Sequence, residues 1–255
     1  MTKAILTTAR LGRQYGGVAA VSDVSFSVDE RSITALIGPN GAGKTTTLNM
    51  ISGLTPPTSG QIDIEGRQTI GLRSDQICRL GVARTFQTPQ IFRSMSVLEN
   101  VLVGTTRIGK VSLLATAFGS PRLREEELEF ASEAEKWLDF VGLKSVSPRL
   151  ISELPFGQIR LAEIARALAS RPKLLLMDEP ASGLSRAETQ QLRELLLQIR
   201  SLAVTILLVE HNMPLVMSTA DHVLVLDKGQ LLASGPPATI QADPLVRRAY
   251  LGAAG

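Results

Sequence analysis

The chain has 255 residues, of which 44% are hydrophobic and 20% charged, and its 27 Lys+Arg against 24 Asp+Glu give a formal net charge of +3. This length fits one large or two smaller domains, and either can bury a core. A single cysteine, Cys78, makes an intramolecular disulfide impossible. No apolar run approaches the ~18 residues of a membrane span, and the first residues lack a secretory signal pattern. We therefore expect a cytoplasmic protein rather than a membrane-embedded, disulfide-stapled or disordered one.

The first part of the chain has strand-like composition. Gly16-Gly17 is a turn between two β-type segments, and a glycine-rich loop leads into a helix over Lys44–Ile51. Continuous apolar runs predict buried strands, and alternation of polar and apolar residues predicts half-exposed ones. The predicted strands in this part are Ala4–Ala9, Val21–Val28, Ser32–Ile37 and Gln61–Glu65.

From about Thr88 the pattern becomes helical. Ser96 and Glu99 have the spacing of a capping box, in which each side chain satisfies a backbone amide of the other residue. Glu125–Phe140 is charged and amphipathic, and we interpret its run of glutamates as a solvated face rather than a metal site. Cys78 lies in an earlier helical stretch without metal-type partners and is predicted to be a buried structural thiol.

The last part of the chain returns to alternating strands and helices. Ser185–Leu202 is predicted to be a helix, with Ser185 and Glu188 at capping-box spacing, and Asp227-Lys228-Gly229 is a hairpin turn signal. This alternation implies a parallel sheet covered on both faces. The predicted strands are Lys173–Met177, Thr205–Val209, Val223–Leu226 and Leu231–Ala233.

A G-x-x-x-x-G-K-[ST] motif runs from Gly38 to Thr45, between a predicted strand and a predicted helix. Glycines let the backbone curl so that successive amides point inward and, with the helix amino terminus, form an anion site. Lys44 can then reach the β- and γ-phosphates of a nucleotide, and the Thr45 hydroxyl can bind Mg²⁺. The predicted nucleotide-binding residues are Gly38, Pro39, Asn40, Gly41, Ala42, Gly43, Lys44, Thr45 and Thr46.

Polar residues follow two of the predicted strands, Lys173–Met177 and Thr205–Val209, and a short β-like run, Val82–Phe86. Ligands of open α/β sheets bind at the carboxyl ends of such strands. Asp178 would hold Mg²⁺, directly or through water, and Glu179 would polarise the attacking water. His211 can contact a γ-phosphate, and Gln87 can reach Mg²⁺ or the water. His222 has no such context, and we interpret it as structural.

Together these motifs resemble the nucleotide-binding subunits of ATP-binding cassette (ABC) transporters over nearly the whole chain. Gly38–Thr45 corresponds to the Walker A motif, and Leu174–Glu179 to Walker B with its catalytic acid. Gln87 corresponds to the Q-loop and His211 to the H-switch. Tyr15 is placed like the aromatic residue that stacks on adenine, although an aromatic residue before a turn is also common core material.

The family signature L-S-G-G-Q is altered to L-P-F-G-Q at residues 154–158. Pro155 lacks the hydroxyl that meets a γ-phosphate, and the loss of such a hydrogen bond costs roughly 1.5–3 kcal/mol. Amides at the start of the next helix, predicted over Ile159–Ala169, can still face phosphate. The resemblance implies that Phe156, Gly157 and Gln158 contact nucleotide. A second departure is Ser185, where the family usually has Asp.

Several segments resemble the branched-chain amino-acid uptake group of this family, in particular the slightly larger (LivG-like) of its two ATPase subunits. Part of this similarity is shared with lipopolysaccharide-export ATPases and with urea and amide importers. The segments are L-P-F-G-Q at residues 154–158, Gly81–Gln87, Val209–Met213 and Arg248–Gly252.

The resemblance implies a single ABC ATPase domain over residues 1–255, with ATP and Mg²⁺ as ligands. Its α/β fold would be a P-loop NTPase (RecA-like) core, assigned to 1–87 and 173–235, with an antiparallel β subdomain, an inserted helical subdomain over 88–172 and a helical tail over 236–255. The implied partners are a second copy or a sister ATPase, two membrane permease subunits and, indirectly, a periplasmic or extracellular solute-binding protein. We expect a peripheral location at the cytoplasmic face of the inner (plasma) membrane and no nucleic-acid partner.

The leading hypothesis is thus the ATPase subunit of an importer for branched-chain amino acids or related small polar solutes. The alternatives are an ATPase of lipopolysaccharide or urea/amide type, a soluble ABC ATPase of translation or DNA repair, and a P-loop kinase. The soluble ABC proteins usually carry two cassettes or a long coiled coil, and a kinase would not explain His211 or Gln158. The apolar segment Val111–Gly119 is either a loop helix or a contact for a membrane partner.

Overall fold

The computed structural model describes residues 3–105 and 121–251. The chain divides into two compact units, the first formed by Met1–Gln87 with Lys173–Gly255 and the second by Thr88–Pro172. Among the described residues, we find no helix with both the length and the apolar character needed to cross a membrane.

A six-stranded sheet forms the centre of the first unit, in the order β10-β9-β3-β8-β7-β6. Neighbouring strands are parallel, except for the antiparallel β9–β10 pair. Every residue of β3, β7 and β8 is buried, as is typical of parallel strands covered on both faces. The strands are β3 (Ile33–Ile37), β6 (Val82–Thr85), β7 (Leu174–Asp178), β8 (Thr205–Val209), β9 (His222–Asp227) and β10 (Gln230–Gly235).

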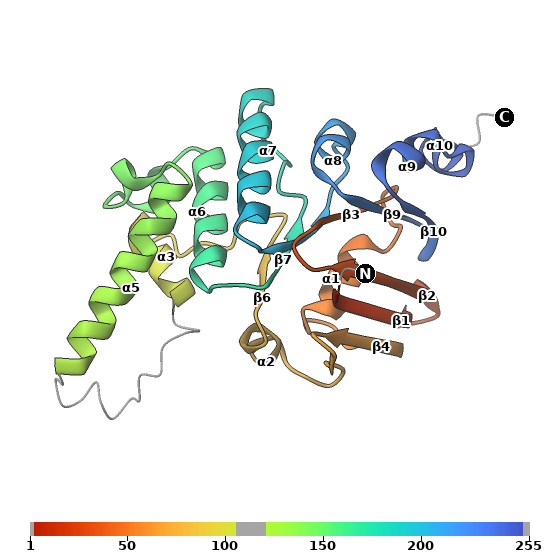
Figure 1. Ribbon diagram of the computed structural model, residues 1–255, viewed down its shortest axis with the longest axis horizontal. Coiled ribbons are helices and arrows are strands. Elements are labelled where there is room, and N and C mark those ends of the chain that lie inside the picture. The colour runs from red at the N-terminus through yellow and green to blue at the C-terminus, as the bar shows by residue number, and fades with distance from the viewer. Residues whose placement is uncertain (1–2, 106–120, 252–255) are drawn as a thin grey trace. The chain divides into compact units, whose positions relative to one another are not determined.

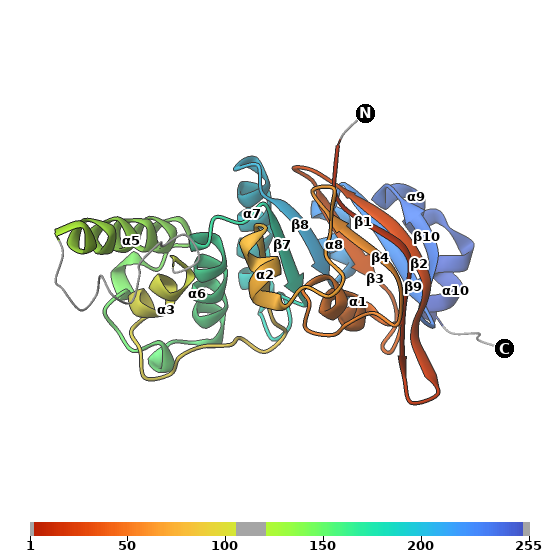
Figure 2. The same ribbon diagram turned by 90° about the horizontal axis from the view of Figure 1, so that it is seen from below.

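One face of this sheet packs against α1 (Lys44–Ile51) and a four-stranded antiparallel sheet, and the three elements share an apolar core. The antiparallel strands lie side by side in Figure 2, and α1 joins the end of β3 through the glycine-rich loop. The order of this second sheet is β2 (Val18–Asp29), β1 (Ala4–Tyr15), β4 (Ser59–Ile64) and β5 (Arg67–Gln68).

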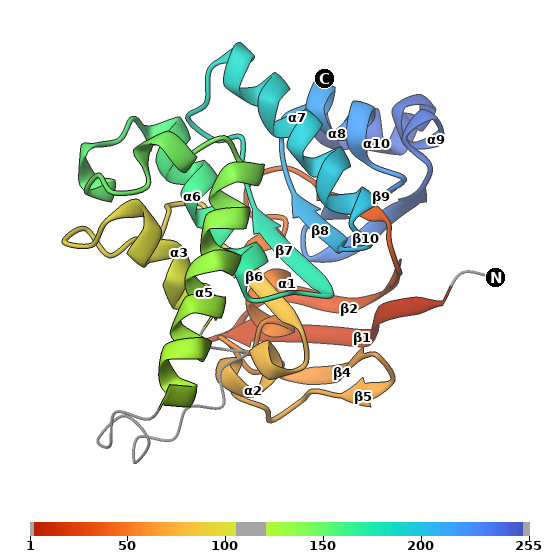
Figure 3. The same ribbon diagram turned by 60° about the vertical axis from the view of Figure 1, so that its left-hand side comes forward.

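The opposite face of the six-stranded sheet is covered by helices from the last part of the chain (Figures 1 and 3). Val216, Ile240 and Val246, from α8, α9 and α10, pack against Ile37 and Val225 of the sheet. The helices on this side are α7 (Arg186–Ser201), α8 (Met213–Thr219), α9 (Pro237–Ala242) and α10 (Pro244–Leu251).

The second unit is helical, and its helices α3, α5 and α6 pack against one another. Arg160 and Glu163 form a buried ion pair on α6, with Nη1 and Oε2 2.9 Å apart. The helices are α3 (Val97–Thr105), α5 (Pro121–Phe140) and α6 (Phe156–Ala169), with 3-10 turns η1 (Lys144–Val146) and η2 (Ile151–Glu153) between the last two.

Local signals in the sequence predicted several element boundaries correctly. The backbone amide of Ser96 donates to Glu99 and the amide of Glu99 donates back to Ser96, so the first capping box is confirmed. The second is confirmed at the start of α7, where Ser185 and Glu188 exchange the same bonds. The predicted hairpin is confirmed by the antiparallel pairing of β9 with β10, and Lys228 and Gly229 both have positive φ in its turn.

Two expectations were wrong, and one helix was missed. Cys78 is partly exposed rather than buried, because α2 (Ser74–Arg79) turns Ile77 toward the core instead. α6 begins at Phe156 rather than Ile159, because Pro155 takes the extended N-cap conformation. Helix α8 was not predicted at all. Val111–Gly119 and the side chains of residues 121–127, including most of the predicted glutamate face, lie outside the described part of the structure.

Candidate functional site

The glycine-rich loop between β3 and α1 depends on glycine at two positions. Gly38 has φ 151°, and a Cβ there would collide with the carbonyl oxygen of Leu226. Gly43 has φ 97° as the N-cap of α1, and a Cβ there would crowd the carbonyl oxygen of Ala20. Since only glycine adopts both conformations without strain, these residues hold the loop against its neighbours and leave the first amides of α1 at the loop.

Lys44 is buried at the base of this loop. Its Nζ donates to the carbonyl oxygens of Gly38 and Pro39, at 2.9 and 3.1 Å. Burial lowers the pKa of Lys44, and the carboxylates of Glu179 and Asp178 oppose that shift. A desolvated ammonium beside inward-facing amides favours an anionic ligand.

Asp178 stands at the carboxyl end of β7, beside the start of α1. The Thr45 hydroxyl donates to Asp178 Oδ1 at 3.3 Å, and Arg84 Nη2 forms a 3.0 Å ion pair with Oδ2. Arg84 Nη1 also donates to the Ser52 hydroxyl at 2.7 Å, and burial lowers the pKa of Arg84 while Asp178 opposes that shift. A hydroxyl and a carboxylate oxygen facing one another are the hard donors that Mg²⁺ takes, so Thr45 and Asp178 fit that ion.

Glu179 follows directly and has φ 47°, a left-handed conformation that costs a non-glycine residue about 1–3 kcal/mol. Its amide donates to the Val209 carbonyl oxygen at 2.9 Å. Gln87 Nε2 donates to Glu179 Oε2 at 2.9 Å, and His211 Nδ1 lies 3.5 Å from the same oxygen. Three predicted residues, from the ends of β6, β7 and β8, therefore meet at one carboxylate oxygen.

Glu210 was not predicted to belong to the site. It is fully buried, and its carboxylate accepts hydrogen bonds from the backbone amides of Ala181, His211 and Asn212, at 2.8, 3.0 and 3.0 Å. It thereby ties the segment after Glu179 to the segment that carries His211. The only sequence signal was an acidic residue at the end of an apolar strand.

The phosphate loop borders a cavity of about 1000 Å³, at the upper end of the range for small-molecule sites. Gln87, Glu179 and His211 line it as well, whereas Asp178 and Glu210 are not among its lining residues. All of its lining residues belong to the first unit, and Ala20 and Ser182 are the two that sequence reasoning missed. Tyr15, 45% exposed, lies at the cavity as well. The lining residues are Tyr15, Ala20, Gly38–Thr46, Gln87, Glu179, Ser182 and His211.

The altered signature lies in the second unit. Pro155 is the N-cap of α6, and its carbonyl oxygen accepts from the Ile159 amide at 3.1 Å. Phe156, Gly157 and Gln158 form the first turn, whose amides have no acceptor within the helix backbone. The other departure, Ser185, serves as the cap of α7.

Comparisons with known proteins identify the family of the chain. A family model for ABC transporters matches residues 21–182, and one for branched-chain amino acid ATP-binding cassette transporters matches residues 230–255. The chain is 42% identical to the high-affinity branched-chain amino acid transport ATP-binding proteins BraF of Pseudomonas aeruginosa and LivG of Salmonella typhimurium, over 100% of each chain.

A solved structure of the ADP conformation of MJ1267, an ATP-binding cassette of an ABC transporter, is also similar. It matches 98% of this chain and 100% of its own, with 34% sequence identity and a TM-score of 0.86. The α/β P-loop NTPase fold predicted from the motifs is thereby confirmed. The chain therefore belongs to the ABC transporter family as an ATP-hydrolysing subunit.

Proposed function

We propose that this protein hydrolyses Mg²⁺-ATP to drive uptake of branched-chain amino acids through a membrane permease. The observation that carries the catalytic part is the convergence of Gln87 and His211 on one carboxylate oxygen of Glu179, at the rim of the phosphate loop. The solute class rests on the full-length similarity to BraF and LivG and on the match of residues 230–255.

The residues at and beside the cavity have three roles in this proposal. Lys44 and the loop amides bind the phosphates, whose charge they offset. Thr45 and Asp178 would hold Mg²⁺, which when bound neutralises charge on the β- and γ-phosphates. Glu179 accepts a proton from the attacking water, and Gln87 and His211 fix the carboxylate that does so.

The chain carries one phosphate loop and one signature, so a complete site needs a second ATPase subunit, either another copy or a sister chain. In that dimer the first turn of α6 from one subunit faces the γ-phosphate held by the other. ATP binding drives closure of the dimer, because the γ-phosphate bridges the two subunits in the closed state. The dimer would act at the cytoplasmic face of the inner membrane on two permease subunits, which receive solute from a binding protein outside.

Uptake measurements in the cells that produce this protein test the proposal. A strain that lacks the chain is complemented with the wild type or with Lys44→Ala, and uptake of labelled leucine, isoleucine, valine and an unrelated amino acid such as proline is compared. We expect Lys44→Ala to abolish rescue of the three branched-chain amino acids and to leave proline uptake unchanged, since the lysine neutralises phosphate charge that the amides only partly offset.

A nucleotide titration of the purified wild type and Lys44→Ala separates the two parts of the proposal. Loss of ATP binding with unchanged leucine uptake would refute the solute class and leave the nucleotide site intact. Wild-type ATP affinity in Lys44→Ala would refute the assignment of the phosphate loop.

A further inference from the structure

Arg13 and Tyr15 lie on the same face of β1, because alternate residues of a strand point to the same side. The guanidinium carbon of Arg13 lies 4.6 Å from the centroid of the Tyr15 ring. Arg13 Nη1 also donates to the carbonyl oxygen of Pro56 at 2.8 Å. The arginine is therefore anchored at its head group by the loop after α1, and its guanidinium covers one side of the tyrosine.

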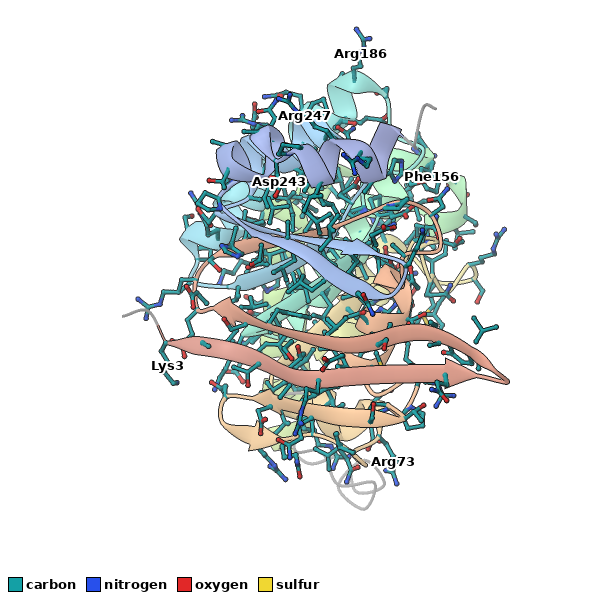
Figure 4. All side chains as sticks on the ribbon, turned by 90° about the vertical axis from the view of Figure 1, so that its right-hand side faces the viewer. Lys3, Arg73, Phe156, Arg186, Asp243 and Arg247 are labelled. Atoms are coloured by element: carbon teal, nitrogen blue, oxygen red, sulfur yellow. The ribbon has the colours of Figure 1, made fainter. Side chains whose placement is uncertain are left out.

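Of this pair, only Tyr15 borders the cavity at the phosphate loop. Tyr15 is a lining residue, whereas neither Arg13 nor Pro56 is among the described residues that line the cavity. Tyr15 ends β1 next to the Gly16-Gly17 turn, and the long β1–β2 hairpin is prominent in Figures 2 and 4. An exposed aromatic ring at such a place has few packing partners to fix its orientation.

We propose that Arg13 is a positioning residue for the base subsite, which holds the Tyr15 ring so that its open side stacks on the purine of the bound nucleotide. The order in space is Pro56 carbonyl, Arg13 guanidinium, Tyr15 ring and purine base. A cation behind the ring is held by the ring's quadrupole, and the planar guanidinium suits stacking better than an ammonium would. The inference rests on the stacking role of Tyr15 within the proposed function.

The test compares affinities for ATP and for inorganic tripolyphosphate, which has the phosphates and lacks the base. Arg13→Met keeps the length of the side chain and removes the cation and the donor. We expect the substitution to weaken ATP affinity roughly two- to five-fold, which corresponds to the free energy of an exposed cation–π contact. Tripolyphosphate affinity should remain unchanged. Arg67→Met, on the exposed strand β5 of the same sheet, is the matched control and should change neither affinity.

A double variant shows whether Arg13 acts through the tyrosine. Tyr15→Ala should lower ATP affinity and spare tripolyphosphate, and adding Arg13→Met to Tyr15→Ala should then have no further effect on either ligand. Thermal unfolding of each variant by circular dichroism checks that the fold is retained.

Each other outcome overturns the inference. Equal losses for ATP and tripolyphosphate in Arg13→Met would mean that the arginine attracts phosphate directly. Unchanged ATP affinity in Arg13→Met, with a loss in Tyr15→Ala, would remove the positioning role and leave the proposed function standing. If Tyr15→Ala leaves ATP affinity unchanged, the stacking role itself is wrong. If the wild type binds neither ATP nor tripolyphosphate, the proposed function fails.

Discussion

Asp178 illustrates how single residues of the site are held from two sides. One carboxylate oxygen accepts a hydrogen bond from the Thr45 hydroxyl, and the other forms an ion pair with the Arg84 guanidinium. Both side chains of the ion pair are buried. The phosphate-loop motif predicted Thr45, and an apolar strand that ends in two acids predicted Asp178. Neither pattern predicted the contacts of Arg84, Glu210 or Arg13. Those contacts depend on which strands lie side by side, and local sequence does not determine strand pairing.

Arg84→Met should destabilise the protein strongly. Removal of one partner from a buried ion pair leaves an uncompensated charge and costs about 3–5 kcal/mol of the free energy of unfolding. The control is Arg200→Met, which breaks the more exposed Arg200–Asp221 pair and should cost about 0–1 kcal/mol. Urea unfolding of the three proteins measures both values. Equal, small losses would show that Arg84 and Asp178 are not coupled in the folded state.

At the scale of the element, local rules accounted for most helices and strands. The two capping boxes fixed the starts of α3 and α7 from the sequence, because a cap is made by residues three apart in the chain. α8 was missed because it has only seven residues, although Asn212 caps it and Pro214 lies in its first turn. The start of α6 was placed too late because Pro155, rather than the usual serine, forms the N-cap.

The capping box of α7 gives a pH prediction. The hydrogen bond from the Ser185 side chain, and then the one from its backbone, lowers the pKa of Glu188 below the ordinary glutamate range. A carboxylate with a lowered pKa stabilises the fold above its ordinary pKa, and the contribution disappears as the pH falls through the folded-state pKa. Ser185→Ala should therefore unfold more easily than the wild type at pH 7, and the difference should shrink as the pH drops below the ordinary glutamate pKa.

Urea unfolding at a series of pH values checks this, with Ser201→Ala near the other end of α7 as the control, whose effect should not vary with pH in the same way. If the loss of unfolding free energy in Ser185→Ala stays constant through the acidic range, the serine stabilises the helix independently of the Glu188 charge.

At the scale of the whole molecule, the sequence motifs predicted the α/β fold class but left the strand order undetermined. The order β10-β9-β3-β8-β7-β6 joins strands that are far apart in the chain, for example β3 with β8, and such pairing arises from the whole core rather than from any segment. That order brings the ends of β6, β7 and β8 together, so Gln87, Glu179 and His211 meet. Their catalytic roles stay predictions until kinetics are measured.

The rate of ATP hydrolysis by Glu179→Gln, measured beside its affinity for ATP, tests the central claim most directly. The amide keeps the shape of the side chain and removes its basicity, so hydrolysis should fall roughly 10²–10⁴-fold while ATP affinity is retained through Lys44 and the loop amides. Glu194→Gln, on the exposed side of α7 outside the cavity, should hydrolyse ATP at the wild-type rate. A wild-type rate in Glu179→Gln would contradict the account at its centre, because the acid after β7 would then not be the catalytic residue.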